Sequence, residues 1–291
     1  MTRNALLVAG PLALDDLPQQ QGLLGGGGGY AAIAASALVP TQLWARGGSH
    51  ISAQVRGILE RRQIDLAGVT WEGPTARWSS TGFASTGPVL PTIEPTNAEN
   101  LGAVLAIDLP PTCGARAFAA FAKLDGAATR PVIVAPRPAD CTANPGWLQE
   151  CAKVADVLIL PAALAAAAEG GALSDPLALA ERIRAWGAKC VVLTRGPFGG
   201  LIVYQNKATT YPALPITVVE PTGIGSAFAG ALAAWCAGAG KADFNAIKRG
   251  LAMASAVASI CAQGIGPKKL LAADNKEYSE RFNKLRRTNK F

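Results

Sequence analysis

The stretch Val218–Ala237 constrains the fold of this chain more than any other. A β-branched run ends at Glu220, the chain turns through residues 222–225 (Thr-Gly-Ile-Gly), and an alanine-rich segment follows in which Gly230 is the only breaker. This order predicts a strand, a glycine loop and a helix. Glycine permits tight turns, and the first N–H groups of a helix have no partner within it. The loop therefore indicates either an anion site or a plain strand-to-helix turn.

The middle of the chain alternates between apolar runs and helical segments. The runs are Ala103–Ile107, Val132–Ala135, Val154–Leu160 and Cys190–Thr194. Strands that alternate with helices predict parallel βαβ units whose strands are buried on both faces. With 291 residues, half of them hydrophobic, the chain is long enough for one large α/β domain in three layers.

The cysteines and the single histidine argue against a metal centre. The six cysteines form no C-x-x-C pair, and most lie within apolar runs. Reduced, buried thiols are typical of cytosolic proteins. No stretch of about 18 apolar residues is free enough of glycine and charge to span a membrane. We therefore expect a cytoplasmic protein with neither a metal cluster nor a membrane segment.

The C-terminal part of the chain is basic. Much of the net charge of +7 lies there, on Lys268, Lys269, Lys276, Arg281, Lys284, Arg286, Arg287 and Lys290. These residues alternate with Tyr278, Phe282 and Leu285, which predicts an amphipathic helix with a solvated basic face. A patch for nucleic acid or an acidic protein is the alternative, and we expect nucleic acid not to be a partner.

Two further segments stand out. Five glycines, Gly25–Gly29, precede an alanine-rich helix, and residues 69–95 are rich in short β-type alternations. Together with the loop at 222–225 and the T-R-G-P-F-G run from Thr194, they resemble, in order, the signatures of the ribokinase-like (PfkB) sugar kinases. The loop resembles the D-[PT]-T-G-A-G-D-[AS]-F signature of that family. The resemblance covers nearly the whole chain.

The resemblance implies an α/β, three-layer ribokinase-like fold with a doubly wound, mostly parallel sheet. Residues 1–291 then form a single domain with a small β lid inserted at about 11–24 and 69–100. ATP and Mg²⁺ are the implied cofactors, and a sugar or nucleoside is the implied acceptor. Lid sheets in this family often pair between subunits, which implies a homodimer.

The same resemblance assigns the candidate site residues. The glycine loop, Gly223, Ile224 and Gly225, corresponds to the anion hole of the family. The [TK]-x-G-x-x-G turn beside the nucleotide phosphates corresponds to Thr194, Gly196 and Gly199. The substrate side corresponds to Asp15, Gly26, Gly27 and the lid residue Arg77, with Asp15 expected in a loop after the first strand.

Three positions depart from the family pattern. Ser226 stands where the family has the aspartate that deprotonates the substrate, and a serine hydroxyl is not a proton acceptor near neutral pH. Leu160 and Ala163 stand where polar groups act on the magnesium, although a hard cation needs oxygen ligands. Glu220 lies on the strand side of the loop, away from the base position.

These departures favour a pseudokinase that keeps the scaffold and residual ligand binding. The alternatives are an active ATP-dependent carbohydrate or nucleoside kinase, and a binding module that uses the basic C-terminal helix.

Overall fold

The computed structural model describes residues 4–51, 53–79, 82–84, 89–92, 94–95, 100–124, 129–168, 170 and 175–288. The strands are β1 (Ala5–Ala9), β2 (Ala13–Leu17), β3 (Gln20–Gly25), β4 (Thr41–Arg46), β5 (Ile64–Asp65), β6 (Val69–Thr70), β7 (Ala76–Ser79), β8 (Gly82–Ala84), β9 (Leu101–Ile107), β10 (Val132–Ala135), β11 (Val157–Pro161), β12 (Cys190–Thr194), β13 (Gly200–Tyr204) and β14 (Lys207–Tyr211). The helices are α1 (Gly27–Ser36), α2 (Ala53–Arg61), α3 (Pro111–Lys123), α4 (Pro138–Ala143), α5 (Pro145–Val154), α6 (Ala162–Ala168), α7 (Pro176–Ala185), α8 (Ile224–Ala239), α9 (Phe244–Cys261), α10 (Lys268–Ala272) and α11 (Asn275–Thr288), with a short 3₁₀ turn η1 (Gly196–Phe198).

The main sheet has the order β14-β13-β12-β11-β10-β9-β1-β4-β5, and β6 pairs with β4. Its pairs from β12 to β5 are parallel, and the β12–β13–β14 hairpins are antiparallel. The carboxyl ends of β1, β9 and β10 therefore lie side by side at one edge of the sheet. Ligands of open α/β proteins bind at such an edge.

A second, four-stranded sheet has the order β3-β2-β7-β8. Strands β2 and β3 come from the segment after β1, and β7 and β8 come from the irregular segment before β9, so the sheet draws on both regions in which the sequence predicts a lid. Asp15 lies within β2 and not in a loop, and its side chain is buried. The expectation of a loop was wrong because residues 13–17 pair with both β3 and β7.

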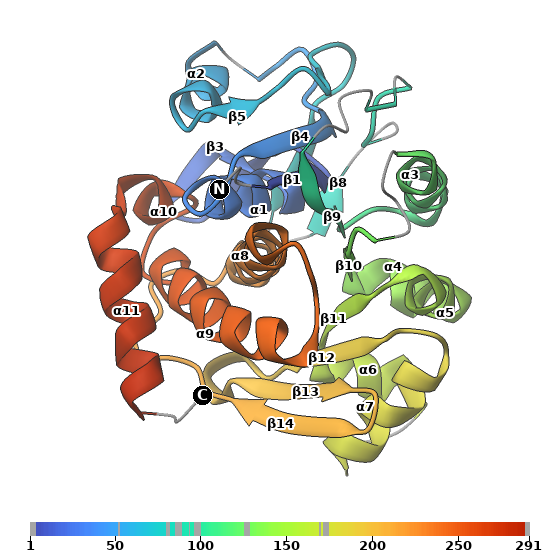
Figure 1. The fold of residues 1–291 in the computed structure, drawn as a ribbon. Coiled ribbons are helices and arrows are strands. Elements are labelled where there is room, and N and C mark those ends of the chain that lie inside the picture. Colours follow the sequence, from blue (N-terminus) through green and yellow to red (C-terminus); the bar gives the residue numbers. More distant parts are fainter. Residues whose placement is uncertain are drawn as a thin grey trace.

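Two hydrophobic cores cover the two faces of the main sheet, which gives the three layers in Figure 1. Alternate residues of β1 point to opposite faces, so that Leu6 and Val8 join the core beneath α1, α8 and α9 while Leu7 and Ala9 join the core beneath α3, α5 and α7. The sheet is buried on both sides, as its apolar runs predict.

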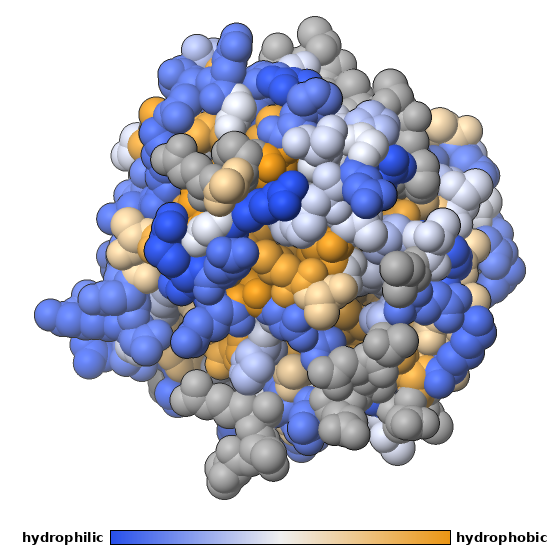
Figure 2. All heavy atoms as spheres, turned by 90° about the horizontal axis from the view of Figure 1, so that it is seen from above, coloured by the Kyte–Doolittle hydropathy of each residue, from blue (hydrophilic) through white to orange (hydrophobic). Residues whose placement is uncertain are grey.

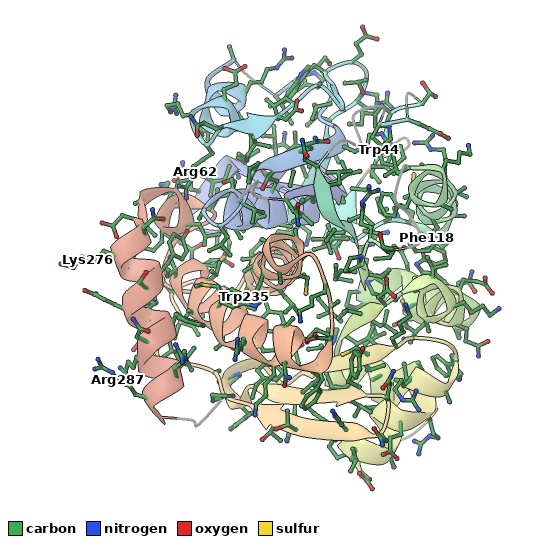
Figure 3. The ribbon with its side chains drawn as sticks, viewed as in Figure 1. Trp44, Arg62, Phe118, Trp235, Lys276 and Arg287 are labelled. Atoms are coloured by element: carbon green, nitrogen blue, oxygen red, sulfur yellow. The ribbon has the colours of Figure 1, made fainter. Side chains whose placement is uncertain are left out.

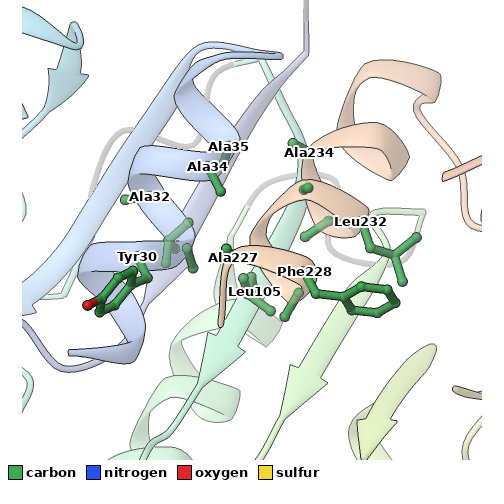
Figure 4. Packing of buried hydrophobic residues seen from close by; sticks show 14 of the residues in the cluster. Tyr30, Ala32, Ala34, Ala35, Leu105, Ala227, Phe228, Leu232 and Ala234 are labelled. Atoms are coloured by element: carbon green, nitrogen blue, oxygen red, sulfur yellow. The ribbon is translucent and has the colours of Figure 1, made fainter. Parts of the chain in front are cut away.

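Helix α8 is buried between α1, α9 and the sheet. Small residues of α1 and α8, among them Ala34, Ala227 and Ala234, let the two helices approach closely above Leu105 of β9 (Figure 4). Gly230 is required at the crossing, because a Cβ there would come 2.3 Å from the carbonyl oxygen of Ala31. This contact fixes the amino end of α8 relative to α1.

The run before the glycine loop differs from its prediction. Residues 212–220, all of which the structure describes, form no strand, and Val218 and Val219 are 50% and 52% exposed. Pro212 and Pro215 lack the N–H that a sheet needs, and the Val219 N–H donates to the carbonyl of Ala262 at 2.8 Å. The loop is therefore anchored to the end of α9 and not to the sheet.

The basic C-terminal segment forms the amphipathic helix α11. Tyr278 and Leu285 are buried against the body of the molecule, whereas the labelled Lys276 and Arg287 point away from it (Figure 3). On the face seen in Figure 2, apolar atoms gather in a central hollow that hydrophilic residues surround. Within the described residues, no helix combines the length and the apolar character that crossing a bilayer requires. All six cysteines are buried free thiols.

Candidate active site

A cavity of about 450 Å³ lies at the carboxyl edge of the main sheet, beside the start of α8. It is lined by Pro11, Asp15, Gly26, Gly27, Tyr30, Trp78, Asp108, Arg137, Pro138, Ala139, Thr222, Gly223 and Ser226. These residues come from the ends of β1, β9 and β10, from the second sheet, from the first turns of α1, α4 and α8, and from the glycine loop before α8. Topology thus brings together segments that are far apart in the sequence.

Asp15 forms one wall of the cavity and is only 1% exposed. Its Oδ1 accepts a hydrogen bond from the Gly26 N–H at 3.2 Å, while Oδ2 has no hydrogen-bond partner among the described residues. Gly25 makes room for this carboxyl group, since a Cβ there would come 2.0 Å from the Asp15 Cγ. The carboxyl group therefore has one acceptor oxygen left for a ligand.

Tyr30 lies beside Asp15 and also has an unsatisfied polar group. Its hydroxyl is buried and makes no regular hydrogen bond within the described structure, although it is close enough to Asp15 to lower the pKa of that group. Burial has the larger effect and raises the pKa of Asp15 to about 6, and the charges of Glu220 and Asp16 add to the rise. Burial also raises the pKa of Tyr30, so its hydroxyl stays protonated.

Asp108 was missed by the sequence analysis, although it directly follows the apolar run that becomes β9. It has a left-handed backbone (φ 50°), and its N–H donates to the carbonyl of Ala135 at 3.0 Å. Its carboxyl group lies against Gly27, where a Cβ would come 2.1 Å from Oδ2. The sequence signal that could have identified Asp108 is an acid directly after a buried apolar run. The contact with Gly27 depends on the folded chain.

Two charged residues at the start of α4, Arg137 and Asp140, affect the pKa of Asp108. Arg137, which precedes α4, forms a bidentate pair with Asp140, with Nε–Oδ2 and Nη2–Oδ1 distances of 2.9 and 2.5 Å. Burial raises the pKa of Asp108 to about 6, with a further contribution from the charge of Asp140. The positive charge of Arg137 and a hydrogen bond from the Ser226 hydroxyl oppose this rise. Ser226 and Asp108 thus lie close together in the lining of the cavity.

The glycine loop is held by Glu220, which is 6% exposed. Its carboxylate accepts hydrogen bonds from the Thr222 N–H at 3.0 Å and from the Thr222 Oγ1 at 2.8 Å. Gly223 has a left-handed backbone (φ 81°) and packs against the ring of Tyr30, where a Cβ would come 2.3 Å from the ring carbons. Glu220 therefore shapes the loop, and both of its carboxylate oxygens are engaged there.

Helix α8 begins without a side-chain cap from any described residue. The N–H groups of Gly225 and Ser226 in its first turn have no acceptor within the helix. Ser226 and Gly223 line the cavity, while Ile224 and Gly225 are next to its lining residues. The amino end of α8 thus presents N–H donors without a helical acceptor, and a positive dipole, beside the cavity.

The other candidate residues lie elsewhere. Thr194, Gly196 and Gly199 belong to the β12–β13 turn and do not line the cavity of Asp15. The Thr194 hydroxyl donates to the carbonyl of Leu160 at 3.4 Å. The Leu160 side chain is fully buried in the core, and Ala163 is exposed on α6.

The lid candidate Arg77 also does not line the cavity. Arg77 pairs with Asp16, with an Nη2–Oδ1 distance of 2.7 Å, and its side chain is half exposed. Trp78, the next residue of β7, does line the cavity. The second sheet therefore contributes an aromatic side chain to the site and keeps its arginine at the surface.

The sequence profile of the pfkB family carbohydrate kinases matches residues 26–269. The chain belongs to this family. A segment of 54 residues in this PfkB-family protein is 50% identical to the cytidine kinase of Thermococcus kodakarensis, and it spans 18% of the chain and 19% of that relative.

Solved structures share the whole fold. Aminoimidazole riboside kinase from Salmonella enterica, complexed with aminoimidazole riboside and an ATP analogue, has a TM-score of 0.80 at 15% identity and covers 96% of this chain and 100% of its own. Fructokinase from Vibrio cholerae O395 with fructose, ADP and calcium ion has a TM-score of 0.77 at 16% identity, covering 97% and 100%. Ribokinase from Cryptococcus neoformans in complex with ADP has a TM-score of 0.73 at 20% identity, covering 96% and 99%. These matches confirm the predicted ribokinase-like fold.

Proposed function

We propose that this PfkB-family protein is a kinase that transfers the γ-phosphoryl group of ATP to a hydroxyl group of a neutral sugar or nucleoside in the Asp15 cavity. The observation that carries the proposal is the buried pair Asp15 and Tyr30, which lie beside each other in the lining of the cavity that also borders the uncapped start of α8. Neither Asp15 Oδ2 nor the Tyr30 hydroxyl makes a regular hydrogen bond within the described structure. Leaving buried polar groups unpaired costs about 1–3 kcal/mol each. A ligand with several hydroxyl groups satisfies both.

Each part of the cavity has a chemical task in this proposal. The Asp15 carboxylate accepts hydrogen bonds from ligand hydroxyls, and the Tyr30 hydroxyl donates one to a ligand oxygen. The N–H groups at the start of α8 fit the charge of a phosphoryl group. ATP supplies that group, and positioning and electrostatic stabilisation account for most of phosphoryl transfer. The acidic lining, with Asp15 and Asp108, disfavours acceptors that already carry a phosphate.

A dedicated magnesium site does not fit the residues at the family positions. Leu160 and Ala163 offer only carbon there, and a hard cation needs oxygen ligands. Among the described residues, no group of three or more His, Cys, Asp or Glu side chains is placed to hold a metal ion. We therefore derive no step through a protein-bound metal.

The second sheet is proposed to act as the lid. Its β7 strand places Trp78 at the cavity, where the side chain would cover a bound acceptor and exclude water. Strands β3 and β8 are its edges among the described strands, and edge strands offer backbone groups for pairing with a second copy. Light scattering of the purified chain tests the homodimer, which remains a prediction.

A pseudokinase is the second candidate, and Ser226 favours it. The side chain at the family position of the proton acceptor is a neutral hydroxyl, and Leu160 and Ala163 are carbon side chains at the magnesium positions. General-base removal costs about 10²–10⁴-fold in rate. In this case the cavity binds an acceptor without turning it over.

The test combines binding with turnover. Isothermal titration with a panel of neutral sugars and nucleosides is expected to find a ligand that Asp15→Asn binds at least 10-fold more weakly, while Asp274→Asn binds it like the wild type. Asp274 is a matched control because it is exposed and caps α11 through the Glu277 N–H at 2.8 Å. ADP release from Mg-ATP with the same ligand supports the kinase. Binding without ADP release supports the pseudokinase, and the absence of both overturns the proposal.

A further inference from the structure

We propose that Asp108 takes the proton from the acceptor hydroxyl and that Ser226 positions the Asp108 carboxyl group for this role. The inference rests on the proposed kinase function and names a residue outside the family signature as its proton acceptor. It explains how the chain can carry out phosphoryl transfer although residue 226 is a serine.

The first support is the place of Asp108 between the two halves of the site. Its Oδ2 lies against Gly27 at the start of α1, and it lines the same cavity as Ser226 in the first turn of α8, whose hydroxyl is close enough to lower the pKa of Asp108. In the proposed complex, the start of α1 borders the acceptor, and the start of α8 presents N–H groups to the phosphoryl group. A carboxylate between them is next to the hydroxyl that must be deprotonated.

The second support is that Gly27 keeps this space open. Any larger residue at position 27 would put a Cβ 2.1 Å from Asp108 Oδ2, so the glycine is required by the carboxyl group itself. Gly25 does the same for Asp15, with a Cβ contact of 2.0 Å to Cγ. Two members of the five-glycine run therefore accommodate the two acids of the cavity.

The other acids near the site are less suited. Both carboxylate oxygens of Glu220 accept hydrogen bonds from Thr222, so Glu220 is committed to the loop. Asp15 is tied to the Gly26 N–H at the start of α1, and Tyr30 lies beside it. Asp108 shares the cavity lining with Ser226, and the Ser226 hydroxyl lowers its pKa.

The charges around Asp108 suit a proton acceptor. Burial raises its pKa to about 6, Arg137 and Ser226 hold the rise back, and Asp140 adds to it. Arg137 and Asp140 face it from the α4 side, and Asp15 shares the cavity from β2. A carboxyl group with this pKa is mostly ionised at pH 7 and is more basic than an exposed aspartate, which favours proton transfer near neutral pH.

The proposed proton and phosphoryl transfer needs only the acceptor, ATP and Asp108. The O–H bond of the acceptor breaks, and its proton moves to the Asp108 carboxylate. The acceptor oxygen uses its electron pair to form a bond to the γ-phosphorus. The bond from this phosphorus to the β,γ-bridging oxygen breaks, and its electron pair leaves on ADP. The proton on Asp108 is then released to water.

Kinetics of Asp108→Asn, Ser226→Ala and the control Asp274→Asn test the inference. Asp108→Asn is expected to lower kcat by about 10²–10⁴-fold with acceptor binding by titration within about 5-fold of the wild type. The acid limb of the wild-type pH profile contains the ionisations of Asp15 and Asp108. In the pH profile of the residual activity of Asp108→Asn, we expect only the ionisation of Asp15 to remain.

Ser226→Ala separates positioning from a merely structural role. The Ser226 hydrogen bond lowers the pKa of Asp108, so its removal is expected to move the acid limb to higher pH while most of kcat is kept above that limb. If the wild type turns over no acceptor, the proposed function fails and this inference with it. If the wild type is active and Asp108→Asn keeps kcat within about 3-fold, the inference alone fails. An acid limb unmoved in Ser226→Ala overturns the positioning role.

Discussion

At the scale of single residues, the site depends on two acids that the fold buries at a cost. Asp15 and Asp108 both have a pKa of about 6, chiefly because burial disfavours the charged form. Arg137, which is paired with Asp140, lowers the pKa of Asp108 only in part, and Arg77 is paired with Asp16 at the surface. Buried acids with such raised pKa values are typical of functional sites.

This cost predicts a pH effect on stability. Well below the unfolded pKa of 3.8, Asp15 is protonated in both the folded and the unfolded state, and its burial has no electrostatic cost. As the pH rises from about 4 to 6, the unfolded chain loses this proton first, so the free energy of unfolding falls. Asp15→Asn is therefore expected to raise the free energy of unfolding at pH 7 by up to about 3 kcal/mol, at 1.36 kcal/mol per pKa unit. Urea unfolding at pH 4 and pH 7 measures it, and a variant that is less stable than the wild type at pH 7 contradicts it.

A second residue prediction concerns Gly27. Gly27→Ala would place a Cβ 2.1 Å from Asp108 Oδ2 and displace the carboxyl group from Ser226. A misplacement of about 1 Å in an active site costs about 100-fold in rate, so kcat with the best acceptor is expected to fall by that order. Gly29→Ala is the matched control, because its Cβ would meet the Leu12 side chain at 3.3 Å and no acid. Equal kcat for the two variants would count against a role for the Asp108 position.

At the scale of elements, the sequence predicted the secondary structure better than the site. The alternating apolar runs predicted the parallel strands, and the glycine loop before an alanine-rich segment predicted helix α8. Val218 and Val219 were expected in a strand, but two prolines and the bond to Ala262 keep them out of the sheet. Asp108 could not be assigned a role because its partners, Gly27 and Ser226, are adjacent only after the chain is wound.

The crossing of α1 and α8 leads to a prediction about stability. Gly230→Ala would bring a Cβ 2.3 Å from the Ala31 carbonyl oxygen, and a backbone atom cannot move aside easily. We expect a loss of about 1–3 kcal/mol in the free energy of unfolding. Gly57→Ala on α2 is the control, since its Cβ would meet only the end of the Arg61 side chain at 3.4 Å, and it is expected to gain up to about 1 kcal/mol. Chemical denaturation of both variants checks the contrast, and a stabilised Gly230→Ala would refute the close crossing.

At the scale of the whole molecule, the cavity joins the second sheet to the main sheet and to α8. A ligand that binds there and not to the unfolded chain stabilises all three together. An acceptor at 100 times its Kd is expected to raise the free energy of unfolding by about 2.7 kcal/mol. Thermal unfolding with and without the ligand measures this gain, which should be lost in Asp15→Asn at the same ligand concentration. A ligand gain that persists in that variant would place the binding site elsewhere.

The basic helix α11 is a separate feature of the whole molecule. Its charges are partly paired, with Arg281 bonded to Glu277, Gln263 and Ser259, and its outward lysine and arginine side chains face solvent. A solvated face of this kind does not require a nucleic-acid partner. Binding of a short DNA duplex that is weak at 150 mM salt and lost on further addition would agree with this reading.

Mass spectrometry of the acceptor after incubation with Mg-ATP and the full chain shows whether the protein is a kinase that depends on Asp108. We expect the wild type to add one phosphoryl group to a neutral sugar or nucleoside, and Asp108→Asn to add almost none in the same time while it still binds the acceptor. Phosphorylation by Asp108→Asn at the wild-type rate, or an acceptor that binds the wild type and is never phosphorylated, would contradict it.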